Sequence, residues 1–223
     1  MTDTLEHYQG ASGEAYFAWQ KRMGLPGGRI EARKFSGSIK PEDTVLDFGC
    51  GTGSMLNALE CARRVGVDIN ASARREAASA GVEVHASLTE IQPSSIDVVV
   101  SNHALEHVTD PFGVCGQLRD VLVPRGRLII CLPFDDWRTE RSHRPGDINH
   151  HLFTWSPLLI GNLLTDTGFV VTSSAVLSRA WPPMWEWLDA HLSNEAFDLV
   201  CAVWSRLRYR RQVIVHAWKP PSP

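Results

Sequence analysis

One stretch of this chain decides its fold: Val45-Leu46-Asp47-Phe48-Gly49-Cys50-Gly51-Thr52-Gly53. Its apolar first half predicts a short strand. The glycines at alternate positions remove the side chains that would hold a ligand away from the backbone. The residues from Ser54 onward can begin a helix whose first amides point at that ligand. The stretch therefore predicts a strand, a tight turn and a helix around a nucleotide-type cofactor.

Asp47, at the end of this predicted strand, indicates which kind of cofactor the turn accepts. A carboxylate repels a pyrophosphate but attracts an ammonium group. The spacing agrees, because the dinucleotide fingerprint needs a glycine three positions after its second glycine, and Ser54 stands at that offset from Gly51. The turn therefore favours a cofactor that carries an amino-acid group over a dinucleotide.

A second predicted strand, 64–68, ends in Asp68, nineteen positions after Gly49. A carboxylate in this place can accept both hydroxyls of a ribose. An adenosine with a charged amino-acid tail therefore fits both acidic strand ends.

Strands and helical stretches alternate along most of the chain, which is typical of a parallel sheet. The predicted strands are 44–48, 64–68, 82–85, 96–101 and 126–132, followed by a helix at 156–167 and strands at 169–177 and 212–218. We expect one domain over residues 1–223, with a helical N-terminal cap over 1–40 and a helical insertion over 179–210.

The fourth predicted strand is followed by Leu105-Glu106-His107-Val108-Thr109-Asp110-Pro111. With the glycine turn and the two acidic strand ends, this motif makes residues 40–177 resemble the class I S-adenosylmethionine-dependent methyltransferases, particularly the small-molecule type. The resemblance implies an α/β, Rossmann-like fold with a seven-stranded mixed sheet of order 3-2-1-4-5-7-6, strand 7 antiparallel and helices on both faces. It also implies S-adenosyl-L-methionine as the cofactor.

The resemblance further implies how the cofactor is held, at the carboxyl ends of the strands. The glycine turn passes beneath its methionine part, Asp47 orients the ammonium group, Asp68 takes the ribose hydroxyls and Ile69 packs on the adenine. The acidic residue that relatives often carry after the third strand is missing, and Ser87 or a backbone group beside Leu88 is expected to replace it. The expected cofactor-binding residues are Asp47, Gly49, Cys50, Gly51, Gly53, Asp68, Ile69, Ser87, Leu88, Asn102 and His103.

Three histidines are candidates for catalysis: His103, His150 and His151. His103 follows the fourth strand, at the rim where the methyl group is transferred. His150 and His151 lie in the polar segment after the fifth strand, and His151 matches a histidine that relatives carry there. An imidazole with a pKa of about 6.5 accepts a proton at neutral pH. We expect His151 to act as a base or a substrate ligand; the alternative is a histidine that only ties the loop to the sheet.

His103, Glu106 and His107 allow a second interpretation. In a helix, their i, i+3, i+4 spacing would gather three metal ligands on one face. The simpler interpretation is that Glu106 lies favourably in a first helical turn and that His107 packs under a neighbouring loop. We therefore expect no bound metal.

The composition limits the partners. A net charge of -3 leaves no broad basic surface, which argues against nucleic acid. Segment 179–210 combines four tryptophans with a basic end. Tryptophans at helical spacing most often serve ordinary packing, and the segment is also open to interpretation as a lid, a substrate wall or a surface between two copies of the chain, with a basic cluster that could attract an anionic substrate. The five cysteines include no CxxC pair, which argues against a disulfide framework or a thiolate metal cage.

The N-terminus lacks the basic start and apolar stretch of a secretory signal, and nowhere do eighteen apolar residues run together. We therefore expect a cytoplasmic protein without a membrane segment.

The function that follows is methyl transfer to a small molecule or saccharide, with oxygen as the expected acceptor atom. The Asn-Pro-Pro-Tyr motif of enzymes that methylate nucleic-acid bases is missing. One alternative is a catalytically silent cofactor-binding or assembly subunit of the same fold, which would be expected to lose Asp47 and the glycines. A weaker alternative is a nicotinamide oxidoreductase, which Asp47 and Ser54 oppose.

Overall fold

A seven-stranded sheet of order β3-β2-β1-β4-β5-β7-β6 forms the centre of the computed structural model, which describes residues 8, 10–21, 24–134 and 141–221. Neighbouring strands from β1 to β5 are parallel, and β7 pairs antiparallel with both β5 and β6. The strands are β1 (Thr44–Phe48), β2 (Arg63–Val67), β3 (Glu83–His85), β4 (Ile96–Asn102), β5 (Leu122–Phe134), β6 (Val170–Leu177) and β7 (Arg211–Trp218). The strand order and the antiparallel β7 confirm the expected fold.

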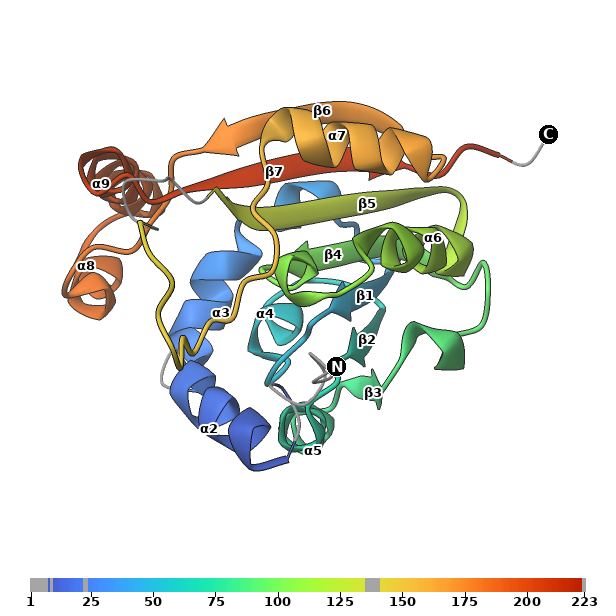
Figure 1. Cartoon of the computed structure of the whole chain (residues 1–223), viewed down its shortest axis with the longest axis horizontal. Coiled ribbons are helices and arrows are strands. Elements are labelled where there is room, and N and C mark those ends of the chain that lie inside the picture. Colours follow the sequence, from blue (N-terminus) through green and yellow to red (C-terminus); the bar gives the residue numbers. More distant parts are fainter. Residues whose placement is uncertain (1–7, 9, 22–23, 135–140, 222–223) are drawn as a thin grey trace.

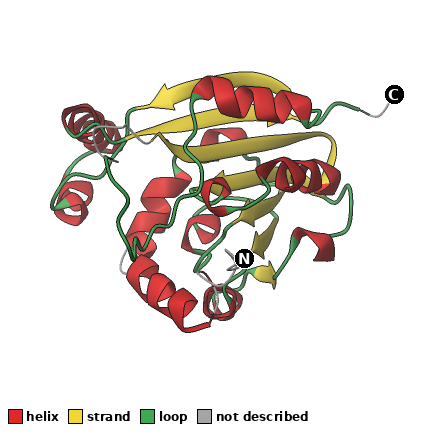
Figure 2. Cartoon of the chain, in the orientation of Figure 1, coloured by secondary structure: helices red, strands yellow, loops and turns green. Residues whose placement is uncertain are grey.

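Helices cover both faces of this sheet (Figures 1 and 2). One face carries α6 (Pro111–Val121) and α7 (Pro157–Asp166), and the other carries α4 (Ser54–Asn57), α5 (Ala71–Ser79) and the end of α3 (Gly24–Ala32). Side chains alternate along a strand, so each strand serves both cores. In β5, Leu128 and Ile130 join the core with α6 and α7, and Ile129 joins the core with α4 and α5.

The predicted strands agree with the observed ones to within one residue at each end, except for β5. β5 begins at Leu122 rather than at residue 126, because fully buried Leu122 pairs with Ile96 of β4 before the register shifts. The helix after the glycine turn is short, because α4 ends at Asn57 and the chain turns to enter β2.

α8 (Trp185–His191) and α9 (Asn194–Leu207) lie between β6 and β7 in the chain and pack against α3 (Figure 1). Ile30 of α3 meets Phe197 and Cys201 of α9 in a small buried cluster that Trp181 and Trp185 flank. Two ion pairs lie nearby: Arg33, just after α3, pairs with Asp189 of α8 at 2.6 Å, and Arg179, in the segment before α8, pairs with Asp198 of α9 at 2.9 Å.

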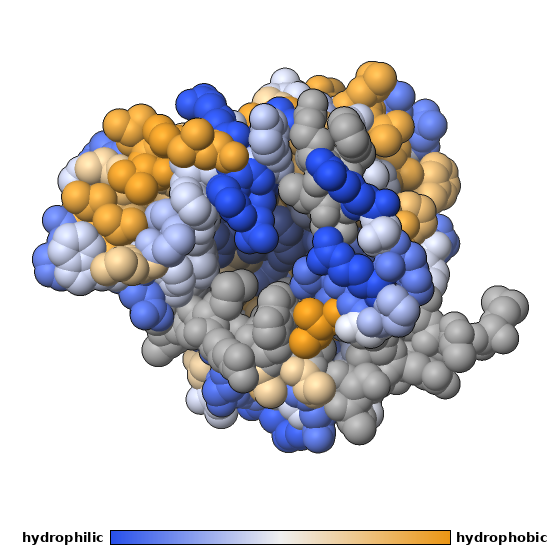
Figure 3. Space-filling model, turned by 60° about the vertical axis from the view of Figure 1, so that its left-hand side comes forward, coloured by the Kyte–Doolittle hydropathy of each residue, from blue (hydrophilic) through white to orange (hydrophobic). Residues whose placement is uncertain are grey.

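The outer side of α8 and α9 is apolar, with Met184, Trp187, Leu199, Val203 and Leu207 exposed. Figure 3 shows this apolar area beside a hollow with hydrophilic side chains along much of its rim.

Among the residues that the structure describes, the N-terminal cap contains α2 (Gly10–Lys21), α3 and a 3-10 turn, Ser36–Ser38. The cap boundary at residue 40 and the single-domain organisation remain predictions. The described residues do not include 1–7, on which the expectation of a cytoplasmic protein partly rests. They also do not include 135–140, which are part of the polar segment after the fifth strand. Within the described ranges, none of the helices has both the length and the apolar run needed to cross a bilayer.

We predict that Phe197→Ala lowers the free energy of unfolding by about 3 to 5 kcal/mol, because the fully buried ring leaves a cavity between α3 and α9. Leu199→Ala on the same helix is the matched control, since Leu199 is 64% exposed and its loss should cost about 0.5 kcal/mol or less. Urea unfolding of both variants measures the difference. Equal losses would contradict the packing of α9 on α3.

Candidate active site

A cavity of about 340 Å³ opens at the carboxyl ends of β1, β2 and β4, the place where open α/β sheets bind ligands. Its walls come from the strand ends, from α6 and from the N-terminal cap. The lining residues are Tyr8, Phe17, Phe48, Gly49, Val67, Asp68, Ile69, Asn70, Ala73, Ala86, Ser87, Leu88, His103, Ala104, His107, Val108, Thr109, Asp110, Gly113, Val114 and Gln117.

The turn after β1 brings bare backbone to this cavity. Gly49, Gly51 and Gly53 have φ angles of 82°, 53° and 73°, a left-handed conformation that glycine adopts at little cost. A Cβ on Gly49 would come within 2.4 Å of the Cβ of Ala104. Any side chain at position 49 would therefore have to displace the segment that follows β4.

Asp47 is a buried carboxylate, with only 2% of its surface exposed. Its Oδ1 has no hydrogen-bond partner among the described residues. Burial, with a smaller contribution from the nearby Asp68 carboxylate, raises the pKa of Asp47 to about 8. An uncompensated buried acid of this kind is stabilised by a cation. The site therefore fits a cofactor that brings an ammonium group, although Asp47 does not itself line the cavity.

Asp68 lies at the cavity wall and is oriented by two backbone amides. Its Oδ2 accepts a hydrogen bond from Gly51 N at 2.8 Å, and its Oδ1 accepts one from Asn70 N at 2.8 Å. Each carboxylate oxygen has a further lone pair, so the pair can still accept ribose hydroxyls. Ile69 and Leu88 supply apolar surface in the same cavity, as an adenine ring requires.

The cavity brings together only some of the predicted residues. Gly49, Asp68, Ile69, Ser87, Leu88 and His103 line it, whereas Asp47, Cys50, Gly51, Gly53, Asn102, His150 and His151 do not. Gly51 still acts on the site by holding Asp68. Cys50 is buried, and its sulfur occupies the space that a Cβ on Gly66 of β2 would need.

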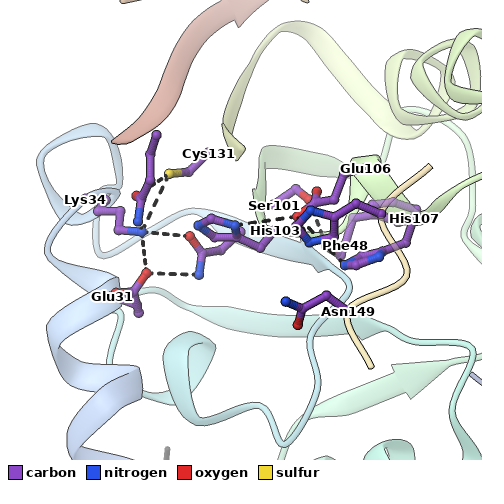
Figure 4. Close-up of polar contacts among 12 residues, drawn as sticks. Glu31, Lys34, Phe48, Ser101, His103, Glu106, His107, Cys131 and Asn149 are labelled. Atoms are coloured by element: carbon purple, nitrogen blue, oxygen red, sulfur yellow. Dashed lines mark hydrogen bonds and ion pairs between the residues drawn. The ribbon is translucent and has the colours of Figure 1, made fainter. Parts of the chain in front are cut away.

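Asn102 belongs to a polar cluster with Glu31 and Lys34, which Figure 4 shows on the side of His103 away from Glu106. Lys34 Nζ donates to Asn102 Oδ1 at 3.0 Å and to Gln212 Oε1 at 2.8 Å, and Asn102 Nδ2 donates to Glu31 Oε2 at 3.0 Å. Lys34 also pairs with Glu31. The N-terminal cap thus engages the predicted rim residue, and the sequence carries no motif that identifies Glu31 or Lys34.

His103 lies between two groups of polar side chains (Figure 4). It has a left-handed φ of 57°, and its backbone N donates to Cys131 O at 2.9 Å. Burial alone would lower the pKa of His103, but polar contacts and charge interactions with Cys131 and with Glu106, whose Oε1 lies 3.5 Å from Nδ1, raise it to about 10. An imidazole held protonated is poorly suited to accept a proton, so the position favours an electrostatic role for His103.

Glu106 is fully buried and has three imidazoles around its Oε1. His103 Nδ1 lies 3.5 Å away, His107 Nε2 3.8 Å and His151 Nε2 4.0 Å. The helical face considered for His103, Glu106 and His107 does not form, because His103 is left-handed and the 3-10 turn begins only at Leu105. His151 joins Glu106 and His107 instead, and their ligand atoms all lie within 4.8 Å of one another.

The loop before α7 is tied to this group by its backbone. Leu152 N and Phe153 N donate to Glu106 O at 2.9 and 3.2 Å, next to His151. In Figure 1 this loop (yellow) runs towards α2 before it returns to α7.

Tyr8 closes the site from the N-terminal cap. Its hydroxyl donates to Asn149 O at 2.8 Å and lies 2.6 Å from His107 Nδ1. Sequence reasoning missed Tyr8, because no motif surrounds it and it lies 99 residues from His107.

Comparison with known proteins shows a methyltransferase domain in this chain. The family model described as "Methyltransferase domain" matches residues 28–174. An uncharacterized methyltransferase of Mycobacterium bovis is 37% identical over 97 residues, which are 39% of this chain and 48% of that protein. The chain spans between 30% and 48% of the length of the first curated relatives that it matches.

Two solved structures share the fold. The phosphoethanolamine N-methyltransferase 2 of Haemonchus contortus, in complex with S-adenosyl-L-methionine, has a TM-score of 0.64 and 19% identity, and covers 99% of this chain and 61% of that one. A SAM-dependent methyltransferase of Archaeoglobus fulgidus has a TM-score of 0.63 and 18% identity, and the match covers 92% of this chain and 99% of that one.

The raised pKa of Asp47 predicts a pH-dependent stability. The folded protein keeps the Asp47 proton up to its raised pKa of about 8, whereas the unfolded chain loses it near the ordinary pKa of 3.8. The folded state therefore binds more protons between these values, and its stability falls as the pH rises through this window. Asp47→Asn removes this effect, so its unfolding free energy should exceed that of the wild type by an increasing margin from pH 5 to pH 8. A margin that stays constant over this range, measured by urea unfolding, would contradict the assignment.

Proposed function

The chain belongs to the S-adenosylmethionine-dependent methyltransferases, and from this premise we propose that it methylates an oxygen of a small-molecule or saccharide-type acceptor. The observation that carries the proposal is the group of Glu106, His107 and His151 beside the cavity. An oxygen nucleophile must lose a proton during the reaction, and a carboxylate flanked by imidazoles is suited to that task.

S-adenosyl-L-methionine supplies an electrophilic methyl carbon on its sulfonium. The residues of the chain position this group. We propose that the glycine turn and Asp47 hold its amino-acid end and that Asp68 holds its ribose, with Ile69, Ser87 and Leu88 around the adenine. Positioning two reactants in this way can lower the activation barrier by roughly 7 to 11 kcal/mol.

The acceptor lies, in this proposal, between the cavity and the loop that carries His150 and His151. Of the two histidines in the group, His151 is the one on this loop. Its side chain is 27% exposed, against 13% for the side chain of His107. The pKa of Glu106 is lower than its ordinary value. Burial would raise this pKa, but the neighbouring imidazoles, and that of His103 most of all, lower it. The resulting carboxylate orients His151 and stabilises it when it is protonated.

The wider setting stays a proposal as well. We propose a cytoplasmic protein that acts on a small acceptor. We also propose that it does not bind nucleic acid, since its net charge is -3. The exposed apolar side of α8 and α9 supports a surface between two copies of the chain.

The silent-subunit alternative is less favoured, because a chain that only assembles with others has no need of an uncompensated buried Asp47. The nicotinamide alternative is less favoured, because a pyrophosphate brings no cation to compensate Asp47 and would be repelled by its charged form.

We predict that the protein binds S-adenosylmethionine and S-adenosylhomocysteine and ignores NAD in titration calorimetry. Asp68→Asn should weaken S-adenosylmethionine binding by about 10-fold or more, since hydrogen bonds to a charged group contribute about 1.5 to 3 kcal/mol. Asp166→Asn at the exposed end of α7 is the control and should bind like the wild type. Tight binding of NAD would overturn the proposal.

We predict that His151→Ala lowers turnover by about 100- to 10,000-fold, the usual contribution of a base, and changes S-adenosylmethionine affinity by less than about twofold. Formation of S-adenosylhomocysteine is measured with hydroxyl-bearing small molecules and saccharides as acceptors. His191→Ala, on exposed α8, should keep full turnover. Unchanged turnover in His151→Ala would remove His151 from the chemistry.

A further inference from the structure

We propose that Glu106, His107 and His151 bind a divalent transition metal ion, for which zinc is the best match, and that this ion takes an oxygen of the methyl acceptor as its next ligand. The inference rests on the proposed function and deepens it. It assigns to the group beside the cavity a cation that the sequence did not lead us to expect.

The spacing of the three side chains fits one ion better than it fits hydrogen bonds. Glu106 Oε1 lies 3.8 Å from His107 Nε2 and 4.0 Å from His151 Nε2. Both separations exceed the range of a hydrogen bond. Zinc–ligand bonds of about 2.0 to 2.2 Å put the ligand atoms of one ion about 3 to 4 Å apart. The separations therefore leave room for an ion at bonding distance.

Glu106 carries the second, independent observation. Its side chain is 0% exposed, and neither Oε1 nor Oε2 has a hydrogen-bond partner among the described residues. A buried carboxylate without close hydrogen bonds is costly. The imidazoles around it approach only to between 3.5 and 4.0 Å. A directly bound cation would satisfy both oxygens at once.

Tyr8 orients His107 as the partners of metal ligands usually do. The Tyr8 hydroxyl donates to Asn149 O at 2.8 Å and also lies 3.4 Å from His150 O, and in the tautomer of His107 that carries its proton on Nδ1 the 2.6 Å contact is a hydrogen bond from Nδ1 to the Tyr8 oxygen. In neutral His107 this leaves the lone pair on Nε2, the atom that faces Glu106. Metal-binding histidines characteristically donate their other N–H to such a group.

The third ligand is brought in by the loop. Backbone bonds from Leu152 N and Phe153 N to Glu106 O fix the segment that follows His151. The rings of His107 and His151 lie edge to face, with 5.0 Å between their centroids. All three ligands are therefore held by the fold rather than by long mobile side chains.

The ligand types select the kind of ion and of acceptor. Two imidazoles and one carboxylate suit zinc and related transition ions, whereas magnesium and calcium prefer oxygen ligands. Zinc with three protein ligands keeps a further position for water or substrate. His107 also lines the cavity, so this position is within reach of a hydroxyl-bearing acceptor. With the ion bound, His151 would serve as a ligand rather than as the base itself: the ion would lower the pKa of the acceptor hydroxyl, whose proton would leave to solvent.

The test titrates zinc chloride into chelator-stripped, full-length protein by calorimetry, and follows cobalt(II) binding by visible absorption. We expect one equivalent to bind, with affinity reduced about 100-fold or more in His151→Ala and in Glu106→Gln, and about 10-fold in Tyr8→Phe, the usual range for an outer partner. His191→Ala on α8 is the matched control and should bind like the wild type. Urea unfolding verifies that each variant is folded.

Two results overturn the inference: no stoichiometric binding by the wild type, or binding that His151→Ala and Tyr8→Phe leave unchanged. Either result reduces the group to a hydrogen-bonded cluster. S-adenosylmethionine binding to the stripped protein is measured in parallel. If it persists without zinc binding, the metal inference alone fails; if it is absent, the proposed function fails first.

Discussion

The proposed active site depends on one buried acidic group that has no compensating charge, the carboxyl group of Asp47 in the strand that leads into the glycine turn. Burial raises its pKa to about 8, and its Oδ1 has no hydrogen-bond partner among the described residues. Only 2% of the surface of Asp47 is exposed to solvent. In the proposed function, the ammonium group of the cofactor compensates Asp47, which would couple the stability of the turn to the occupation of the cavity.

Much of the fold was predictable because its signals are local. Alternating apolar runs located the strands, and the family resemblance implied the order with an antiparallel β7 that the structure shows. Gly49 and Asp68 were identifiable for the same reason, since a turn and a strand end can be read from a few neighbouring residues. β5 was placed too short because its first residues depend on pairing with β4.

The rest of the site depends on contacts between residues far apart in the chain. Tyr8 meets His107 across 99 positions, and Lys34 meets Asn102 across 68. No periodicity or motif encodes such pairs. The expected grouping of His103, Glu106 and His107 assumed a helix, whereas the left-handed His103 breaks that geometry and the loop supplies His151 in its place. Side-chain identity was informative there, but only the tertiary structure selects the partners.

Calorimetry of S-adenosylmethionine binding at pH 7, in two buffers with different ionisation enthalpies, tests the central claim most directly. Asp47 holds a proton in the free protein at this pH, and the ammonium group of the cofactor should displace it. We predict proton release approaching one per cofactor bound in the wild type, and none in Asp47→Asn, which should also bind more weakly. Binding without proton release in the wild type, or equal release in Asp47→Asn, would contradict the account.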